Sequence, residues 1–342
     1  MSKVRYGIIG CGVIHHSHVE ALEKLADVAE LVAVCDHDPV PLAAAVERCG
    51  VPGYADLREL VALPNVDAVI VCTPSGYHGD HAIAALDAGK HVITEKPIEI
   101  SMAKTNLMIA AAERNSRTLS CISQTRYGAG IRQMHAWMDE GKLGKIVYGE
   151  VLIKRYRTQA YYDSAGWRGT WEVDGGGALM NQGVHYVDQL VWAMGKPKTV
   201  YARMGTLAHE RIAVEDMVTA TIEFESGALG TLMATTCAYP GLEATIDLHG
   251  TEGSVCVGDE KLKRARFTNG EVYGPETDAP PTTVGADPRT GAISDHWRQL
   301  NDFSRALLDG RPPEITAADG RAALALVLAV YESARTGEVV RV

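Results

Sequence analysis

Gly10 and Gly12 follow a short apolar run, and three histidines stand within the next six positions of the segment GIIGCGVIHHSH. Both glycines lie between a predicted strand and a predicted helix, the context in which a G-x-G turn receives a pyrophosphate at a helix N-terminus. The first glycine permits the tight turn and the second allows close backbone approach, while His15 stands where a third glycine is usual. The predicted cofactor contacts of this turn are Gly10, Gly12, Val13 and Ile14.

The histidines of this segment also allow a second interpretation, a metal site. His15 and His18 can share one face of a helix, but no cysteine or carboxylate at ligand spacing joins them. His16 is expected to be a solvated helix residue. We therefore predict a dinucleotide turn and no bound metal.

Asp36 ends the apolar run LVAVC, 24 residues after Gly12. A carboxylate at this place accepts hydrogen bonds from the adenosine ribose hydroxyls and repels a 2′-phosphate. No arginine follows it directly in the sequence DHDP, so the pattern favours NAD over NADP. His37, the next residue, is a further predicted cofactor contact.

Short apolar runs alternate with helical patterns over the first third of the chain. Such an alternation is typical of βαβ units with a parallel sheet that is buried on both faces. The expected strands are 3–10, 29–36, 66–74, 91–97 and 117–123, and the expected helices are 16–26, 39–50, 78–89 and 101–115.

The pattern changes near residue 125, where long alternating strands follow one another without helices between them. This change predicts a Rossmann domain over 1–124 and an α+β domain with an open, mostly antiparallel sheet over 125–342. The expected helices of the second domain are 131–144, 178–195, 296–310 and 318–337, and its expected strands are 145–157, 199–207, 216–236, 243–258 and 264–274. The proline-rich stretch 274–291 is expected to be a surface loop.

The chain has 342 residues, enough for two domains, and its formal charge is -10. This charge disfavours nucleic-acid and anionic-membrane partners, because no block of lysines and arginines offsets it. The seven cysteines form no C-x-x-C pair, which indicates reduced thiols in a reducing compartment. No charged leader and no apolar run of membrane-spanning length is present, so we expect a cytoplasmic protein.

Three stretches together resemble the Gfo/Idh/MocA oxidoreductases: residues 7–18 with His18, CTPSGYHGDHAIAALDAGKHVITEKPI, and GGGALMNQGVHYVDQL. The resemblance covers nearly the whole chain. It implies a Rossmann domain with an open-faced sheet domain, and a homodimer or homotetramer packed through that sheet. The segment WRGTWEVDGGGALMNQGVHYVD is most similar to members that oxidise C3 of sugars, since inositol dehydrogenases carry Asp where this chain has Asn181.

The resemblance also implies catalytic roles. Lys96 is expected to hydrogen-bond the reacting hydroxyl and stabilise its developing negative charge. A cis peptide bond before Pro97 is expected to orient the lysine. His185 is expected to be the catalytic base, with Asn181 orienting the substrate or the imidazole and Asp188 acting locally. We expect the ammonium and the imidazole, from separate domains, to face one substrate hydroxyl.

Further cofactor contacts follow from the resemblance at the ends of the later strands. These contacts are Thr73, Pro74, Ser75, His78, Glu95, Lys96 and Gln124. The segment 154–171 is rich in arginine and aromatic residues, which bind the hydroxyls, carboxylates and C–H faces of sugars. The predicted substrate contacts are Arg155, Tyr156, Trp167, Arg168 and Asn181.

The predicted activity is NAD-dependent oxidation of a secondary hydroxyl, at C3 of a sugar, glycoside or nucleotide sugar. The alternatives are an inositol or polyol dehydrogenase and an NAD-dependent glycosidase of the same family. A non-catalytic nucleotide sensor is a further alternative, which the presence of both Lys96 and His185 disfavours.

Overall fold

Parallel strands and helices alternate in the first of two units of the chain, whose computed structural model describes residues 2–274 and 295–342. The first unit comprises residues 1–124 and 294–321, and the second comprises residues 125–293 and 322–342. Of the stretch 274–291, predicted to be a surface loop, all but Gly274 lies outside the described residues.

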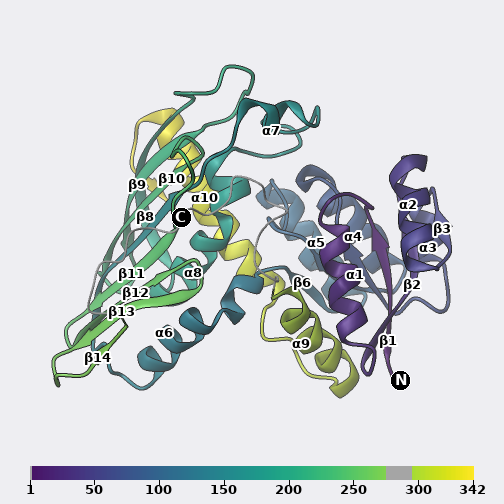
Figure 1. Ribbon diagram of the computed structural model, residues 1–342, viewed down its shortest axis with the longest axis horizontal. Helices are drawn as coiled ribbons and strands as arrows, with labels where there is room; N and C mark the ends of the chain where they lie inside the picture. The colour runs from purple at the N-terminus through teal and green to yellow at the C-terminus, as the bar shows by residue number, and fades with distance from the viewer. Residues whose placement is uncertain (1, 275–294) are drawn as a thin grey trace. The chain divides into compact units, whose positions relative to one another are not determined.

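The sheet of the first unit is parallel, with the strand order β3-β2-β1-β4-β5-β6 (Figure 1). This is the doubly wound order of a Rossmann fold, in which the order reverses between β1 and β4. All four residues of β4 are buried, as expected for a strand with helices on both faces. The strands are β1 (Val4–Ile9), β2 (Ala29–Cys35), β3 (Gly53–Tyr54), β4 (Ala68–Val71), β5 (His91–Thr94) and β6 (Leu119–Cys121).

Local sequence signals set the ends of several helices in this unit. The carboxylate of Asp38 accepts a hydrogen bond from the Val40 amide and caps α2, which Gly50 ends in a left-handed conformation. Ser101 caps α5 in the same way. The helices are α1 (His15–Lys24), α2 (Pro39–Cys49), α3 (Leu57–Val61), η1 (Ser75–Tyr77), α4 (His78–Asp87), α5 (Met102–Arg114) and α9 (His296–Asp309). The short helix η2 (Gln124–Tyr127) begins in this unit and continues into the second.

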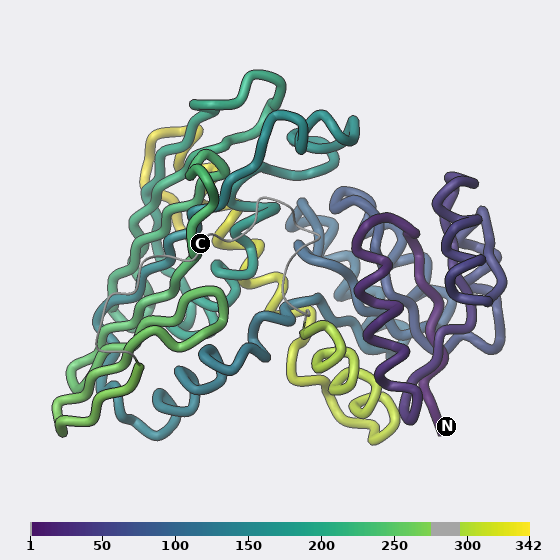
Figure 2. Tube along the Cα trace, viewed as in Figure 1, coloured from purple at the N-terminus to yellow at the C-terminus, as the bar shows by residue number. Residues whose placement is uncertain are grey.

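Helix α9 differs from the prediction, which placed it in the second domain. Leu300 and Phe303 are buried in one core cluster with Val19 of α1, and the Tyr6 and Ser304 hydroxyls lie 2.8 Å apart. Figure 2 shows the yellow-green α9 beside the purple α1. Burial of this apolar face, rather than proximity in sequence, therefore assigns the helix to the first unit.

The second unit is built on a sheet ordered β14-β13-β12-β11-β7-β10-β9-β8-β15 (Figure 1). Its described neighbours pair antiparallel except β7 and β10. Helices α6 and α8 pack on one face of the sheet. The strands are β7 (Ile146–Lys154), β8 (Pro197–Gly205), β9 (Met217–Phe224), β10 (Leu229–Thr235), β11 (Thr245–Gly250), β12 (Gly253–Gly258), β13 (Lys261–Phe267), β14 (Val272–Tyr273) and β15 (Val340–Arg341).

The predicted helix 178–195 is divided into two kinds of helix. Its first part, η3 (Ala178–Gly183), is a π-helix, and its second part is α8 (Val184–Met194). Asn181 and His185 therefore do not lie on one continuous α-helix, as the predicted helix 178–195 would require. The remaining helices are α6 (Ala129–Asp139), α7 (Gln159–Asp163) and α10 (Ala317–Thr336). None of the described helices combines the length and apolar character that a membrane span requires.

Candidate active site

Most of the predicted cofactor residues follow the ends of the parallel strands. Strand pairing places Cys35, Ile9, Val71, Thr94 and Cys121 in one row across the first unit's sheet. The residues that follow this row lie at the carboxyl edge of the sheet, where open α/β sheets bind ligands. This edge therefore collects the glycine turn, Asp36, the loop that begins at Thr73 and the Glu95–Lys96 pair.

The glycine turn has the backbone that the sequence predicts. Gly10 has a φ of 99°, and a Cβ there would lie 2.7 Å from the backbone carbon of Cys72. A Cβ at Gly12 would meet no atom within 4 Å. Gly10 is thus required by the protein's own packing, while Gly12 leaves open space for a ligand beside the start of α1.

Asp36 connects the end of β2 with the glycine turn. Its Oδ2 accepts a hydrogen bond of 2.8 Å from the Cys11 amide, and its Oδ1 accepts one of 3.0 Å from the Asp38 amide. A carboxylate has about four acceptor positions, so capacity remains for ribose hydroxyls. The ring of His37 is almost fully exposed, with its Nδ1 3.3 Å from Asp36 Oδ1.

His78 braces two loops of this edge. Its ring nitrogens lie 2.8 Å from the backbone oxygens of Thr73 and Pro97. Burial lowers the pKa of His78, and the two backbone hydrogen bonds oppose that shift. His78 thus positions the two loops through its ring nitrogens, and its predicted contact with the cofactor stays a prediction. Of its neighbours, Ser75 is buried and Pro74 precedes η1.

Glu95, which precedes the predicted catalytic lysine in the chain, is buried. Its Oε1 lies 2.8 Å from His18 Nε2 and 3.2 Å from His296 Nε2, and its Oε2 accepts a hydrogen bond of 3.1 Å from the Lys96 amide. Burial raises the pKa of Glu95, but the hydrogen bonds from the two histidines outweigh it and hold that pKa well below its usual range. The Lys96–Pro97 bond is cis, as predicted. Glu95 therefore fixes the backbone that carries Lys96.

In the second unit, Glu215 holds the start of the π-helix that carries Asn181. Its carboxylate accepts hydrogen bonds from the amides of Gly177 (2.9 Å) and Leu179 (2.8 Å) and from the Tyr331 hydroxyl (2.9 Å). Burial nevertheless raises the pKa of Glu215 to about 7. A Cβ at Gly177 would collide with the Glu215 backbone oxygen, so this glycine is required by close packing. π-Helical turns often occur at functional sites.

Helix α8, which carries His185, is anchored by a buried ion pair. Asp188 accepts two hydrogen bonds from the guanidinium of Arg126, at 2.6 and 2.7 Å. The same guanidinium lies 4.8 Å from the ring centre of Trp192, one turn further along α8. Asp188 thus fixes the helix through a residue distant in sequence, a partner that sequence analysis did not identify.

The predicted substrate residue Arg155 has its charge paired within the protein. Its guanidinium donates 2.6 Å and 3.1 Å hydrogen bonds to Asp259 and to the Tyr186 hydroxyl, and that hydroxyl donates to Asp259 over 2.9 Å. Burial raises the pKa of Tyr186, which makes it a poor acid. The ring of Tyr156, another predicted contact, packs edge-on against Tyr239.

A polar cluster joins the predicted substrate segment, residues 154–171, to the π-helix. The Asn181 amide donates to Asp174 and accepts a 3.0 Å hydrogen bond from Gln182 Nε2. Gln182 Oε1 in turn accepts a 2.7 Å hydrogen bond from Arg157. Sequence analysis missed Arg157 and Gln182, although Arg157 stands two residues from Arg155 in the same basic, aromatic segment.

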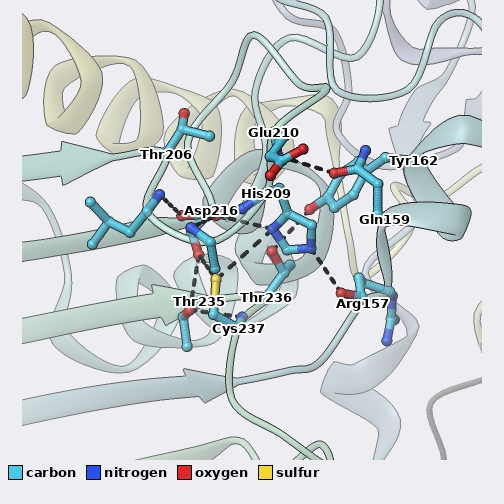
Figure 3. Close-up of polar contacts among 12 residues, drawn as sticks. Arg157, Gln159, Tyr162, Thr206, His209, Glu210, Asp216, Thr235, Thr236 and Cys237 are labelled. Atoms are coloured by element: carbon cyan, nitrogen blue, oxygen red, sulfur yellow. Dashed lines mark hydrogen bonds and ion pairs between the residues drawn. The ribbon is translucent and has the colours of Figure 1, made fainter.

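His209 fastens a neighbouring loop to this segment (Figure 3). Its Nε2 lies 2.9 Å from the Arg157 carbonyl oxygen, and its Nδ1 lies 3.0 Å from Asp216 Oδ2 and 4.0 Å from the Cys237 sulfur. Asp216 also accepts three backbone amide hydrogen bonds, from residues 207–209. His209, itself held by Asp216, therefore keeps the Arg157 backbone in place.

Two clusters in the described residues bring together side chains that can bind metals: His18, Glu95 and His296, and His209, Asp216 and Cys237. In the first cluster the Glu95 carboxylate contacts both histidines, and in the second the Asp216 carboxylate contacts His209. These contacts give each cluster a structural role that needs no ion.

Comparison with known proteins assigns the chain to a family. Residues 4–123 match the oxidoreductase family model with an NAD-binding Rossmann fold, and residues 131–256 match the GFO/IDH/MocA C-terminal domain. The solved WlbA dehydrogenase from Chromobacterium violaceum, in complex with NADH and UDP-GlcNAcA, is 38% identical, with a TM-score of 0.88. That match covers 100% of this chain and 96% of the other. The chain is a Gfo/Idh/MocA oxidoreductase.

Two curated members of the Gfo/Idh/MocA family illustrate its range of reactions. The myo-inositol 2-dehydrogenase of Thermotoga maritima is 27% identical over 96% of both chains. The D-glucoside 3-dehydrogenase of Escherichia coli is also 27% identical, over 98% of this chain and 97% of that protein. The resemblance identified from the sequence motifs is thereby confirmed.

The first unit of this Gfo/Idh/MocA oxidoreductase fits its cofactor, NAD. Gly12 faces open space, and Asp36 retains acceptor capacity for a ribose. The buried Oε1 of Gln124, which follows β6, has no hydrogen-bond partner among the described residues and can accept a donor from a ligand. NAD supplies a hydride acceptor when bound at this edge.

Proposed function

We propose that this protein oxidises the C3 hydroxyl of a nucleotide-linked sugar acid, with NAD as the oxidant. The observation that carries the proposal is the full-length similarity to a dehydrogenase solved with NADH and UDP-GlcNAcA. The D-glucoside 3-dehydrogenase relative supports C3 as the position of oxidation. Asn181 in place of the aspartate of inositol dehydrogenases supports the same subgroup.

In the proposed reaction, His185 accepts the proton of the C3 hydroxyl and Lys96 donates a hydrogen bond to the same oxygen. The lysine charge stabilises negative charge that develops on that oxygen as the C–H bond breaks. Asn181, whose amide is oriented by Asp174 and Gln182, holds the sugar. When bound, NAD would supply the acceptor for the hydride that leaves C3. These roles rest on the match of the E-K-P and G-G-x-x-x-N-x-x-x-H motifs to the family.

Formation of NADH by the purified protein tests the proposal. We expect reduction of NAD with UDP-GlcNAcA, little with UDP-GlcNAc or free hexoses, and weaker activity with NADP. A substrate deuterated at C3 should transfer deuterium to the nicotinamide, and one deuterated at C4 should not. Transfer from C4, or turnover of neutral sugars alone, would contradict the proposal.

The similarity to a myo-inositol 2-dehydrogenase favours polyol oxidation as the second candidate function. The same assay with myo-inositol distinguishes the two, because an inositol dehydrogenase reduces NAD without any nucleotide sugar. A glycosidase of this family would cleave a glycoside with no net change in NADH. Measuring NADH and released sugar in the same reaction separates hydrolysis from oxidation.

We also propose that the exposed face of the second unit's sheet joins copies of this chain into a dimer or tetramer. Strand pairing aligns Thr231, Thr221 and Tyr201 across three strands, and these side chains share one face. Leu229, on the same face, is 59% exposed. Light scattering should give a multiple of the 36.8 kDa chain mass, and Leu229→Lys should lower that multiple.

A further inference from the structure

Three arginines of the substrate segment differ in how their charge is balanced. Arg155 is paired with Asp259 at 2.6 Å. Arg157 and Arg168 form no ion pair with any carboxylate among the described residues, and their printed side-chain hydrogen bonds go to neutral groups. A guanidinium that is partly removed from water is costly to bury unless an anion accompanies it.

The side chain of Arg157 is held by neutral partners. It donates a 2.9 Å hydrogen bond to the Tyr156 carbonyl and a 2.7 Å hydrogen bond to Gln182 Oε1, while its buried Nε has no partner among the described residues. Burial and the nearby charge of Arg155 lower the pKa of Arg157. The Arg157 backbone is fixed at both ends, by Thr236 and by His209 (Figure 3).

Arg168 approaches the same aromatic ring as Arg157. Its guanidinium donates a 2.7 Å hydrogen bond to the Tyr161 hydroxyl, and its buried Nε also has no partner among the described residues. The guanidinium carbons of Arg168 and Arg157 lie 4.5 and 5.3 Å from the ring centre of Tyr161. Arg168 also stacks on Trp167, at 4.6 Å. Two uncompensated cations are therefore held around one tyrosine.

We infer that Arg157 and Arg168 form a receptor for the carboxylate of the sugar acid, an inference that rests on the proposed function and names the group that gives it selectivity. The planar guanidinium matches a carboxylate through paired N–H donors, and each Nε supplies a donor that the protein leaves unused. Binding of the carboxylate supplies the negative charge that the protein itself does not place beside these arginines.

The sugar carboxylate fits this receptor better than the diphosphate of the nucleotide does. Gln182 bonds both Arg157 and Asn181, so one hydrogen-bond chain links the receptor to the residue proposed to hold the sugar ring. Asn181 in turn precedes the proposed base, His185, by four residues. A group carried on the hexose itself is the anion within reach of such a chain.

Binding measurements on the NADH-loaded protein test the receptor. The variants are Arg157→Met and Arg168→Met, which keep an unbranched apolar side chain and remove the charge. The probes are UDP-GlcNAcA, UDP-GlcNAc and UDP, which share the diphosphate and differ in the carboxylate. We expect each variant to raise the Kd for UDP-GlcNAcA about 10- to 100-fold and to change the Kd for UDP-GlcNAc less than about threefold.

Arg298→Met is the matched control, because Arg298 also stacks on an aromatic ring, that of Trp297 at 4.8 Å, but is paired with Asp295. It should leave all three affinities unchanged. Unchanged NADH affinity and unfolding temperature show that the receptor variants are folded. Equal losses for UDP-GlcNAcA and UDP-GlcNAc would overturn the inference in favour of the diphosphate, and no loss would overturn it outright.

The failure of the receptor and the failure of the proposed function give different results. If the unaltered protein binds UDP-GlcNAcA selectively through these arginines but does not reduce NAD with it, only the proposed reaction is wrong. If it oxidises UDP-GlcNAcA and the two variants do so with unchanged KM, only the receptor is wrong.

Discussion

The hydroxyl of Tyr331, on α10, lies 2.9 Å from Oε1 of the buried Glu215 and donates a hydrogen bond to it. That carboxylate also accepts hydrogen bonds from the Gly177 and Leu179 amides at the start of the π-helix, so Tyr331 acts on the Asn181 segment through Glu215. The Tyr331 hydroxyl also acts on it directly, because it accepts a 3.1 Å hydrogen bond from the Met180 amide. Both residues are positioning residues, because they set the backbone before His185.

Removing the Tyr331 hydroxyl tests this arrangement. Burial raises the pKa of Glu215 from its ordinary value of 4.5 to about 7 in the folded protein. This shift contributes to the free energy of unfolding in full below pH 4.5, and the contribution is lost as the pH rises through 7. The hydroxyl stabilises the ionised form, so Tyr331→Phe should cost about 1 kcal/mol at pH 6 and about 2 kcal/mol at pH 8. Urea unfolding at both pH values measures this, with Tyr77→Phe, at an exposed tyrosine, as the control. A cost that does not depend on pH would contradict the role of Glu215.

Asp36→Asn tests the cofactor edge. The amide oxygen of asparagine can still accept the Cys11 hydrogen bond, while the negative charge and one acceptor are lost. We expect the Kd for NAD to rise about tenfold and the preference for NAD over NADP to narrow, because repulsion of a 2′-phosphate is removed. Calorimetric titration with both cofactors measures the change. Asp56→Asn, at an exposed helix cap, is the control and should leave both affinities unchanged. If Asp36→Asn kept the same preference for NAD over NADP, the Asp36 carboxylate would not be the group that distinguishes the two riboses.

The sequence predicted the first unit well because its signals are local. Apolar runs set the strands, and a row of strand ends then places Gly10, Asp36 and Lys96 at one edge without any long-range information. The cis bond at Pro97 followed from the family motif. The packing of α9 in the first unit was not predictable, because a helix pattern in the sequence does not indicate which apolar surface the helix covers.

The second unit was harder to predict because its site depends on distant partners. Arg155 and Arg157 stand two residues apart in one segment, and only Asp259, 104 residues beyond Arg155, distinguishes the paired cation from the unpaired one. The π-helix depends on the carboxylate of Glu215, which reaches it from another part of the chain. The contacts by which His78 holds two loops were not predicted, because its two backbone partners are not encoded in its spacing.

His15 supplies a test of stability against pH. It is fully buried, its two ring nitrogens have no partner among the described residues, and burial lowers its pKa to about 4. Because the unfolded chain takes up this proton near pH 6.5, stability falls as pH drops from about 6.5 to about 4. His15→Leu should therefore be about 1 kcal/mol more stable at pH 7 and lose less stability toward pH 4.

The matched control for this test is His16→Leu, at the exposed neighbouring histidine, which should follow the unaltered protein at every pH. Unfolding curves at pH 7, 5.5 and 4 measure all three proteins. An equal loss of stability in His15→Leu and the unaltered protein would show that His15 is not the titrating group.

Variants of Lys96 and His185 test the proposed proton transfer. Without the lysine charge, negative charge on the substrate oxygen is less stabilised, so Lys96→Met should lower kcat about 10²- to 10³-fold. Without the base, His185→Gln should lower kcat about 10²- to 10⁴-fold and leave the Kd for NADH unchanged. Since both residues act on one oxygen, the double variant should be little slower than the slower single variant. Steady-state NADH formation gives these rates, and Lys104→Met, at a surface lysine paired with Asp80, is the control. Single-variant losses that multiply in the double variant would mean that the two side chains act in separate steps.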